Sequence, residues 1–583
     1  MAYIKMSRFS GVAPRVSPRL LNDTYAQVAE DVDVRSGRLE PLKTDSTVTS
    51  LVNSIRKSIY LYEGQHWLEW NEDYVKAVPG PVPGDTNARL YWTGEGTTQP
   101  TSFPRMGVLS GILAVGVDGY PEASYRLGVP APEAAPAVVL SGTADETQIP
   151  DDVAYIYTLV TAFGEEGPPS LASTVLEKTD PESVTITMSN VDVPTGNYNF
   201  GAGALKRIYR SNVGSNTSEY QFLAEVAITT EVYVDNVSSS QLGEVIPSLS
   251  WIGPPNDDVA LYPDGPMQGL TALANGIFAG FTGKRLCLSE PYLPHAWPID
   301  YRITLEESIV AIGGTSNGVL CLTDGKPYFV TGTDPSSMVA VQLDFAQACI
   351  NKHSVVDMGE YLMYASPDGL CIAASSGSQV VTLPLITPEQ WVDSTGAFRP
   401  DKIKAFRHEG AYVAFWEDGG SFGGWVFDPT SEDATLTTLD ISAAVQGGFT
   451  NPKDGELYLV VGSNVVKHRG SPSTVKPLTW RSKKFFLPKP VSLTWLSVSA
   501  EAYPVSLKVW GDGVLVADYT LDFVGPHYTH TVTVPAGASV GTLREPVMRM
   551  PSKIAQEWQV EVTSQTAINE VCLAQSIEEV QDT

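Results

Sequence analysis

The hydrophobic positions of this chain fall into short runs, about four to eight residues long, that are rich in β-branched and aromatic residues. Examples are "SIYLYEGQHWLEW" (58–70), "VLCLTDGKPYFVTG" (319–332) and "YLMYASPDGLCIAA" (361–374). Such runs favour the pleated sheet, and the Asp-Gly pairs at 324–325, 368–369 and 454–455 favour tight turns between strands. We therefore predict an all-β protein.

Helical periodicity is confined to two short segments. "NDTYAQVAEDV" (22–32) and "TPEQWV" (387–392) are the best candidates, and we predict one short helix in each.

The strand runs indicate more than one β domain. Over 51–130 and 266–470 they recur at the spacing expected of the blades of a β-propeller, although no WD40 or kelch signature repeats. The linker "GVPAPEAAPAVVLSG" (128–142) leads into about seven turn-bounded segments, which is typical of a fibronectin-III/Ig-like sandwich domain inserted into the propeller. Alternation in "VSLKVWGDGVLVADYTL" (505–521) predicts a C-terminal β-sandwich domain.

These patterns give four predicted segments. They are an N-terminal arm with the first propeller blades (1–133), the inserted fibronectin-III-like domain (134–250), the remaining blades (251–475) and the C-terminal β domain (476–583).

The chain is acidic, with 66 Asp and Glu against 38 Lys and Arg and a net charge of −28. The excess lies mainly in 134–250, with −11, and in 251–475, with −13. Because high-affinity DNA binding requires clustered Lys and Arg, this balance disfavours a conventional DNA-binding surface. It is compatible with a surface past which DNA slides, and solubility alone also explains it.

The arm "FSGVAPRVSPRL" (9–20) contrasts with the rest because it contains no acid. Pro14 and Pro18 favour an extended backbone. The residues alone indicate a terminal strand in which Arg15 and Arg19 are solvated.

The sequence offers weak candidates for catalysis. Gly314 to Gly318 form a GxSxG, but a strand follows it where a nucleophile elbow needs a helix, so we predict a hairpin turn. Adjacent acids such as Glu165 and Glu166 are expected to be solvated. His295 is expected to pack beside Trp297. We therefore expect no catalytic site and no enzyme.

No motif for a cofactor or a metal site was found. His527 and His530, three apart on an expected strand, point to opposite faces and make a poor shared metal site. The five cysteines (Cys287, Cys321, Cys349, Cys371 and Cys572) are widely spaced, which indicates buried free thiols. "LKRIYRS" (205–211) mixes basic and aromatic residues, but its position in an acidic module favours a structural role over nucleic-acid contact. No segment has the length of apolar residues needed for a membrane span, and the start lacks the apolar region of a secretory signal.

Three groups of co-linear phrases resemble tail nozzle proteins of short-tailed bacteriophages. "FSGVAPRVSPRLLNDTYAQVAEDVDVRSGRLEPLK" (9–43) resembles their opening, with Ser10 where Gly is common and Asp31 or Asp33 where Asn is usual. Residues 269–313, 324–338 and 349–370 are similar to their central propeller. "WRSKKFFLPKP" (480–490) and "CLAQSIEEV" (572–580) are similar to their C-terminal β domain.

The resemblance implies a structural virion protein. It implies a hexameric tube below the portal and adaptor rings that retains the genome and conducts double-stranded DNA into the host, without sequence-specific binding. Further implied partners are tail fibres or spikes and a tip or plug protein. With this resemblance, Arg15 and Arg19 become candidates for pairing with acidic flanks of a neighbouring subunit or ring. The implied location is the virion tail, assembled in the bacterial cytoplasm.

Two alternatives remain open, a receptor- or carbohydrate-binding tail protein and a polysaccharide-degrading enzyme. A propeller-based receptor- or carbohydrate-binding tail protein would use aromatic residues such as Trp297, Trp391, Trp416 and Trp425 to stack on sugars, although a core position for these residues is the simpler interpretation.

Overall fold

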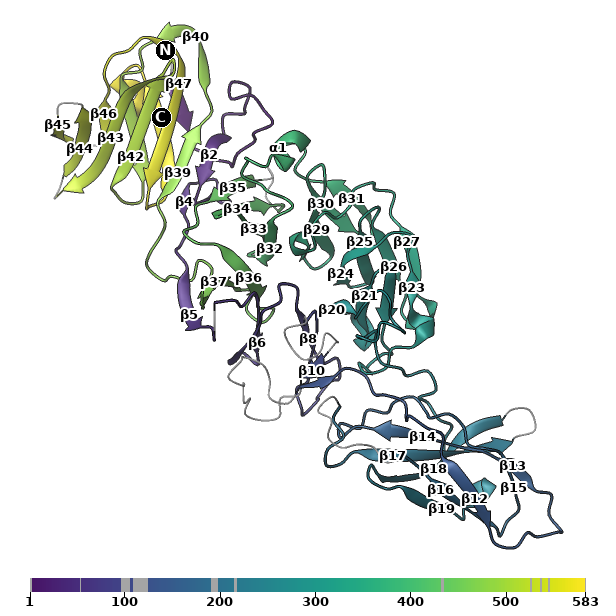
Figure 1. Ribbon diagram of the computed structural model, residues 1–583. Coiled ribbons are helices and arrows are strands. Elements are labelled where there is room, and N and C mark those ends of the chain that lie inside the picture. The colour runs from purple at the N-terminus through teal and green to yellow at the C-terminus, as the bar shows by residue number, and fades with distance from the viewer. Residues whose placement is uncertain are drawn as a thin grey trace. The chain divides into compact units, whose positions relative to one another are not determined.

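The computed structural model describes residues 3–52, 54–95, 105–107, 124–189, 198–213, 218–430, 435–524, 527–534, 537–543 and 546–581. In these residues the protein is mostly β, as predicted, with many antiparallel sheets and two short α-helices, α1 (Pro388–Val392) and α2 (Ile577–Gln581) (Figure 1). None of the described helices is long and apolar enough to span a membrane. The chain forms two compact units, residues 62–344 and residues 1–61 with 345–583, and each is described by itself.

The unit 62–344 contains three sheets of four antiparallel strands, each following the chain order. Their strands are β8 (Lys76–Pro79), β9 (Leu90–Thr93), β10 (Arg105–Gly107) and β11 (Ser124–Arg126); β20 (Gln268–Ala272), β21 (Phe278–Thr282), β22 (Arg285–Leu288) and β23 (Ile303–Thr304); and β24 (Ile309–Thr315), β25 (Gly318–Thr323), β26 (Tyr328–Thr331) and β27 (Val339–Gln342). The same unit holds β7 (His66–Trp70) and the 3-10 turns η2 (Ala274–Gly276), η3 (Ile299–Tyr301) and η4 (Pro335–Ser337).

Between β11 and β20 lies a module with its own hydrophobic core, to which Tyr157, Val184 and Ile208 contribute. Its sheets are β12-β16-β19, β14-β17-β18 and β13-β15, all antiparallel. The strands are β12 (Ala137–Ser141), β13 (Asp151–Val153), β14 (Tyr155–Val160), β15 (Leu176–Lys178), β16 (Ser183–Thr187), β17 (Leu205–Val213), β18 (Ser218–Ala227) and β19 (Val232–Asp235), followed by the turn η1 (Ser239–Gln241).

Two of the three four-stranded sheets in the other unit are formed mainly by residues between 356 and 467. One is β28 (Val356–Asp357), β29 (Tyr361–Ala365), β30 (Leu370–Ala374) and β31 (Gly377–Val380), preceded by η5 (Lys352–Ser354). The other joins β36 (Val445–Thr450), β37 (Leu457–Val461) and β38 (Asn464–Lys467) to β5 (Ser46–Ser50), so its last strand comes from the start of the chain. The strand β6 (Ser58–Tyr62) ends at the boundary between the units.

A twelve-stranded sheet links the middle of the chain to its C-terminal part. It runs through β32 (Ile403–His408), β33 (Ala411–Asp418), β34 (Ser421–Asp428), β35 (Thr435–Leu439), β2 (Ala26–Glu30), β39 (Leu478–Ser482), β47 (Ala555–Ser564), β42 (Val505–Gly511), β43 (Val514–Val524), β44 (His527–Val534) and β45 (Gly537–Leu543), with β40 (Phe485–Val491) beside β47. A smaller sheet is ordered β1 (Tyr3–Met6), β48 (Ile568–Ala574), β41 (Trp495–Ala500) and β46 (Val547–Arg549), and β3 (Val32–Asp33) pairs with β4 (Glu40–Pro41).

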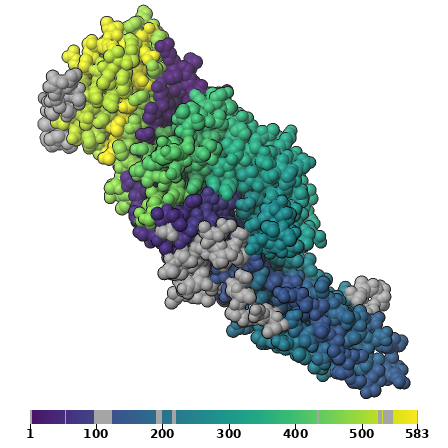
Figure 2. Space-filling view, in the orientation of Figure 1, coloured from purple at the N-terminus to yellow at the C-terminus, as the bar shows by residue number. Residues whose placement is uncertain are grey.

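The start of the chain is therefore part of sheets built from its end. β1 pairs with β48, and β2 lies between β35 and β39. In Figure 2 the N-terminal residues, in purple, lie against the green and yellow residues of the same unit. The segment boundaries predicted from the sequence did not anticipate this pairing.

The predicted helix over 22–32 is wrong, because residues 26–30 form strand β2. Their backbone groups pair with Thr479 to Ser482 on one side and with Thr438 on the other, and this tertiary pairing outweighs the weak helical pattern. The predicted helix at 387–392 is confirmed as α1, which begins with a capping box at Thr387 and Gln390.

The local turn and cysteine predictions are confirmed. The Asp-Gly pairs at 324–325, 368–369 and 454–455 each join two adjacent antiparallel strands. The GxSxG segment is a hairpin turn in which Thr315 is paired with Gly318. All five cysteines are buried and free.

Gly11 marks a close contact between the arm and β35. A β-carbon at this position would lie 2.2 Å from the carbonyl oxygen of Leu436, and the next residue, Val12, donates its N–H to that same oxygen. The arm can therefore approach β35 only because residue 11 has no side chain.

Candidate functional site

The two arginines of the N-terminal arm both contact their own chain. The Arg15 guanidinium donates to the Leu383 carbonyl at 2.5 Å, and the Arg15 backbone N–H donates to Leu385. Arg19 lies 3.2 Å from the Glu557 carboxylate and 5.1 Å from the ring centre of Phe486. The arm is thus docked within the unit. Because the Arg19 side chain is 61% exposed, a role in assembly stays a prediction.

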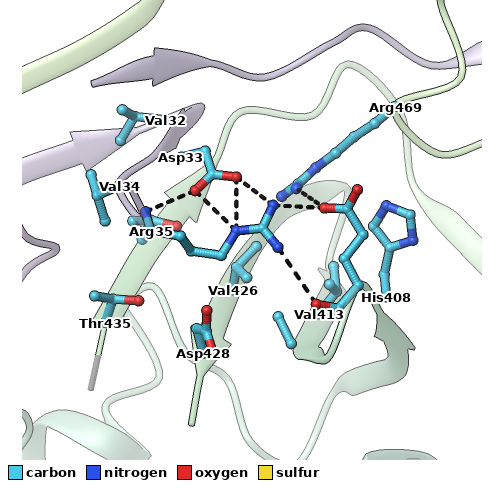
Figure 3. A pocket seen from close by; sticks show the side chains of 13 residues that line it. Val32, Asp33, Val34, Arg35, His408, Val413, Val426, Asp428, Thr435 and Arg469 are labelled. Carbon is cyan, nitrogen blue, oxygen red and sulfur yellow. Dashed lines mark hydrogen bonds and ion pairs between the residues drawn. The ribbon is translucent and has the colours of Figure 1, made fainter. Parts of the chain in front are cut away.

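A second group of charged side chains joins the segment after the arm to the turn that follows β32 (Figure 3). The Arg35 guanidinium lies between two carboxylates, with Nη2 2.5 Å from Asp33 Oδ2 and 2.7 Å from Glu409 Oε2. Arg469 approaches the same Glu409 oxygen at 3.5 Å. The cavity beside these side chains measures about 20 Å³, which is room for one water molecule. The arrangement therefore joins two parts of the chain and has no space for a larger ligand.

The electrostatics of this charge cluster agree with a structural role. Burial alone would raise the pKa of Asp33 and of Glu409, but the hydrogen bonds from Arg35 outweigh it and hold both values below normal. Burial lowers the pKa of His408 to about 4, and the neighbouring His468 and Arg469 add to the shift. His408 is therefore neutral at pH 7, with its ring 5.3 Å from that of His468.

Acidification should destabilise the unit through this cluster. The folded pKa of His408 lies below its unfolded value of about 6.5, so its contribution is present above pH 6.5 and is lost as the pH falls towards 4. The nearby His468, Arg469 and Arg35 further lower the pKa of His408, whereas Glu409 raises it. Between pH 7 and pH 4, we expect the His408→Phe protein to lose about 3 kcal/mol less stability than the unsubstituted protein.

Urea unfolding at pH 7, 5 and 4 measures this effect. An unchanged pH dependence in the His408→Phe protein would contradict the role assigned to His408. Lys402→Ala, which removes an exposed cation of the same unit, is the control and should follow the unsubstituted protein.

The prediction that Glu165 and Glu166 are solvated is wrong, because they are only 4% and 3% exposed. Glu165 pairs with Arg89 at 2.7 Å, and Glu166 pairs with Arg207 at 2.8 Å and accepts a hydrogen bond from Tyr209. Burial raises the pKa of Glu165 to about 7, with Arg89 opposing the shift. These acids attach the turn after β14 to both the module and the sheet that contains β9.

The basic residues of "LKRIYRS" have partners within the module, which agrees with the predicted structural role. Lys206 donates to the carbonyls of Ser189 and Thr230, and Arg210 forms a fully buried ion pair with Asp235. Arg207 pairs with Glu166 and with a second acid, Glu225, on β18. These three cations are engaged inside an acidic module.

The remaining candidates lie apart from one another. His295 is buried and its ring packs edge-on against Trp251. Burial lowers its pKa to about 4. His527 and His530 lie on one strand, β44. Among the described residues, no group of three or more His, Cys, Asp or Glu side chains is placed to hold a metal ion.

The comparisons with known proteins do not identify a family. No protein-family model matches the chain, and no curated protein matches it. Among solved structures, it is similar to PorZ, a surface component of the type-IX secretion system of Porphyromonas gingivalis, at 13% identity and a TM-score of 0.25. The alignment covers 62% of this chain and 44% of PorZ. A similarity of this size carries no argument about fold or function.

Proposed function

We propose that this protein is a bacteriophage tail nozzle: a structural protein that forms a hexameric tube below the portal and adaptor, retains the genome and conducts double-stranded DNA during ejection. The proposal starts from the resemblance of residues 9–43, 269–313, 324–338, 349–370, 480–490 and 572–580. The observation that carries it furthest is the order of the sheets. A run of four-stranded antiparallel sheets is interrupted once, between β11 and β20, by a separate module.

The finer architecture belongs to the same proposal. The four-stranded sheets formed by β8 to β11, β20 to β31 and β36-β37-β38-β5 would each be blades of a propeller, and the module would be the inserted fibronectin-III/Ig-like sandwich. The sheet β36-β37-β38-β5 supports this view, because its fourth strand comes from the start of the chain. A ring of blades made from one chain can be closed in this way. The strands after β38 would form the C-terminal sandwich.

The proposed mechanism is electrostatic and mechanical. A chain of net charge −28, repeated around a channel, presents a surface that repels phosphates, so DNA slides without being held. No catalytic step and no cofactor is part of the mechanism. The partners would be five further copies, the head-to-tail adaptor ring, fibres or spikes, and a plug protein, in a virion tail assembled in the host cytoplasm.

Native mass spectrometry and electron microscopy of the purified protein test the proposal. A nozzle should give a ring of about 375 kDa, six copies of 62.8 kDa, with a central hole. A trimer would instead indicate a receptor-binding spike, and a monomer under all assembly conditions would contradict the proposal.

Arg19→Ala then tests the assembly role of the arm. Glu557 keeps Lys484 as a partner at 2.9 Å, so the fold should lose less than about 1 kcal/mol. We expect fewer hexamers at a given protein concentration, because a largely exposed guanidinium would be missing from the subunit contact. Lys402→Ala is the matched control, and equal hexamer yields for the two variants would exclude the role of Arg19.

Three of the four tryptophans that suggested the carbohydrate-binding alternative are buried. Trp297, Trp391 and Trp425 are at most 1% exposed, and Trp416 holds the guanidinium of Arg399 against its ring. None of these three buried rings is available to stack on a sugar. We therefore do not propose sugar binding by the aromatic residues of the propeller.

A further inference from the structure

A groove on the unit 1–61 with 345–583 has the size and lining of a ligand site. It is lined by residues 473–475, 477, 503–504, 506, 520 and 563–566, and we call it the hydroxyl groove. It lies between the segment that precedes β39 and the ends of β42, β43 and β47. Its volume of about 560 Å³ falls in the range of small-molecule sites.

The lining is unusual for so acidic a protein because none of its twelve residues is charged. Nine of them carry a hydroxyl, phenol or amide group. Lys476 sits between two lining residues, but its ammonium lies 3.0 Å from Asp31 Oδ1 and also donates to the Asp440 carbonyl. Its charge is therefore neutralised outside the groove.

Part of the lining is held rigidly by the sheet. The registers of β39, β47, β42 and β43 place Thr479, Thr563, Ser506 and Thr520 in one cross-strand row. Adjacent strands are about 4.8 Å apart, so the row is a regular series of hydroxyl groups. Because the backbone fixes them, a ligand would bind without the entropic cost of ordering a loop.

The hydroxyls of Ser506 and Thr520 retain bonding capacity. The hydroxyl oxygens of Ser506 and Thr520 are 3.1 Å apart, so their mutual hydrogen bond uses one of the two protons and one lone pair. One donor and three acceptor positions remain on this pair alone. Gln565, exposed on the turn after β47, adds an amide donor and acceptor.

We infer that the hydroxyl groove binds a neutral carbohydrate. Sugars combine paired donors and acceptors with apolar C–H faces, and the groove offers hydroxyls for the former and Val475, Pro477 and Pro504 for the latter. Phosphates and carboxylates require cationic partners that this lining lacks, and the net charge of −28 repels them. The inference concerns the C-terminal sheets and does not depend on the nozzle function.

The test uses the full-length protein and four probes: maltohexaose, chitohexaose and mannohexaose as neutral sugars, and hexagalacturonic acid as the charged one. Saturation-transfer NMR detects binding and calorimetry measures it. We expect at least one neutral sugar to bind with a dissociation constant below about 10 mM, without dependence on salt. The proposal is overturned if no neutral sugar binds at that concentration, or if the acidic sugar binds more tightly.

Two variants locate the site. Ser506→Ala combined with Thr520→Val should weaken binding at least about tenfold, and Gln565→Ala, on an exposed turn, should weaken it without touching the sheet. Thr185→Val, on β16 outside the groove, is the matched control and should bind as the unsubstituted protein does. Unchanged affinity in both groove variants would show that the sugar binds elsewhere and would overturn the assignment.

Discussion

Deleting residues 1–20 should prevent stable folding of the unit that contains the C-terminal sheets. The deletion removes β1, whose four residues pair with β48, and with it four buried side chains, Ile4, Met6, Phe9 and Val12. At about 2 kcal/mol each, their burial approaches the 5–15 kcal/mol that stabilises a whole domain. Circular dichroism melting and limited proteolysis measure the loss, and a truncated protein with an unchanged melting temperature would contradict it.

Adding a single methyl group at Gly11 should also destabilise this unit. Gly11→Ala places a β-carbon against the Leu436 carbonyl, and the displacement that follows should lower the free energy of unfolding by about 2–3 kcal/mol. Gly201→Ala, whose new carbon would meet its nearest atom at 3.8 Å, is the matched control and should change little.

The expected loss of folding also changes what an assembly experiment on the truncated chain can measure. A truncated chain that fails to form hexamers would report the loss of folding as much as the loss of a subunit contact. Arg19→Ala leaves β1 and the buried residues in place, so it separates the two effects.

Removing the guanidinium of Arg210 should have the largest effect of any single change in the inserted module. Its Nη1 lies 2.7 Å from Asp235 Oδ2, and the two side chains are 1% and 0% exposed. Arg210→Met would leave a buried carboxylate with the Tyr155 hydroxyl as its remaining side-chain donor, at a cost of about 3–5 kcal/mol. Hydrogen exchange of the β14 and β17 amides measures the change, and we expect their protection to fall.

Two controls isolate the buried charge as the cause. Adding Asp235→Asn to Arg210→Met should restore part of the protection, because the uncompensated charge is gone. Lys326→Met breaks an exposed pair with Asp344 and should change stability by less than about 1 kcal/mol. Equal protection in the Arg210→Met and unsubstituted proteins would rule out the assigned role.

The features that the sequence predicted correctly are local ones. The Asp-Gly turns, the hairpin at Thr315 to Gly318 and helix α1 are each specified within a few residues, by turn chemistry or by a capping box. The all-β class follows from the same short patterns.

The features that it missed depend on partners far along the chain. Residues 26–30 form a strand because Thr438 and Thr479 to Ser482 supply hydrogen bonds, and nothing within 22–32 specifies those partners. Glu165 is buried because Arg89 lies opposite it in space. Pairing of the arm's arginines with acids of a neighbouring subunit stays a prediction, and nothing in the composition of the arm indicated that Arg19 pairs with Glu557 of the same chain.

The pairing of the two ends of the chain has a consequence for synthesis on the ribosome. Met6 pairs with Val571, and Ser46 pairs with Lys467, so the first strands have no partner until late in translation. At about 5–20 residues per second, roughly 30 to 110 s pass before β1 meets β48. A chain that stops before residue 571 leaves Ile4 and Met6 of β1 without the strand that pairs with them. The unit can therefore fold completely only after β48 has been synthesised. Chains that stop earlier remain targets of chaperones and proteases.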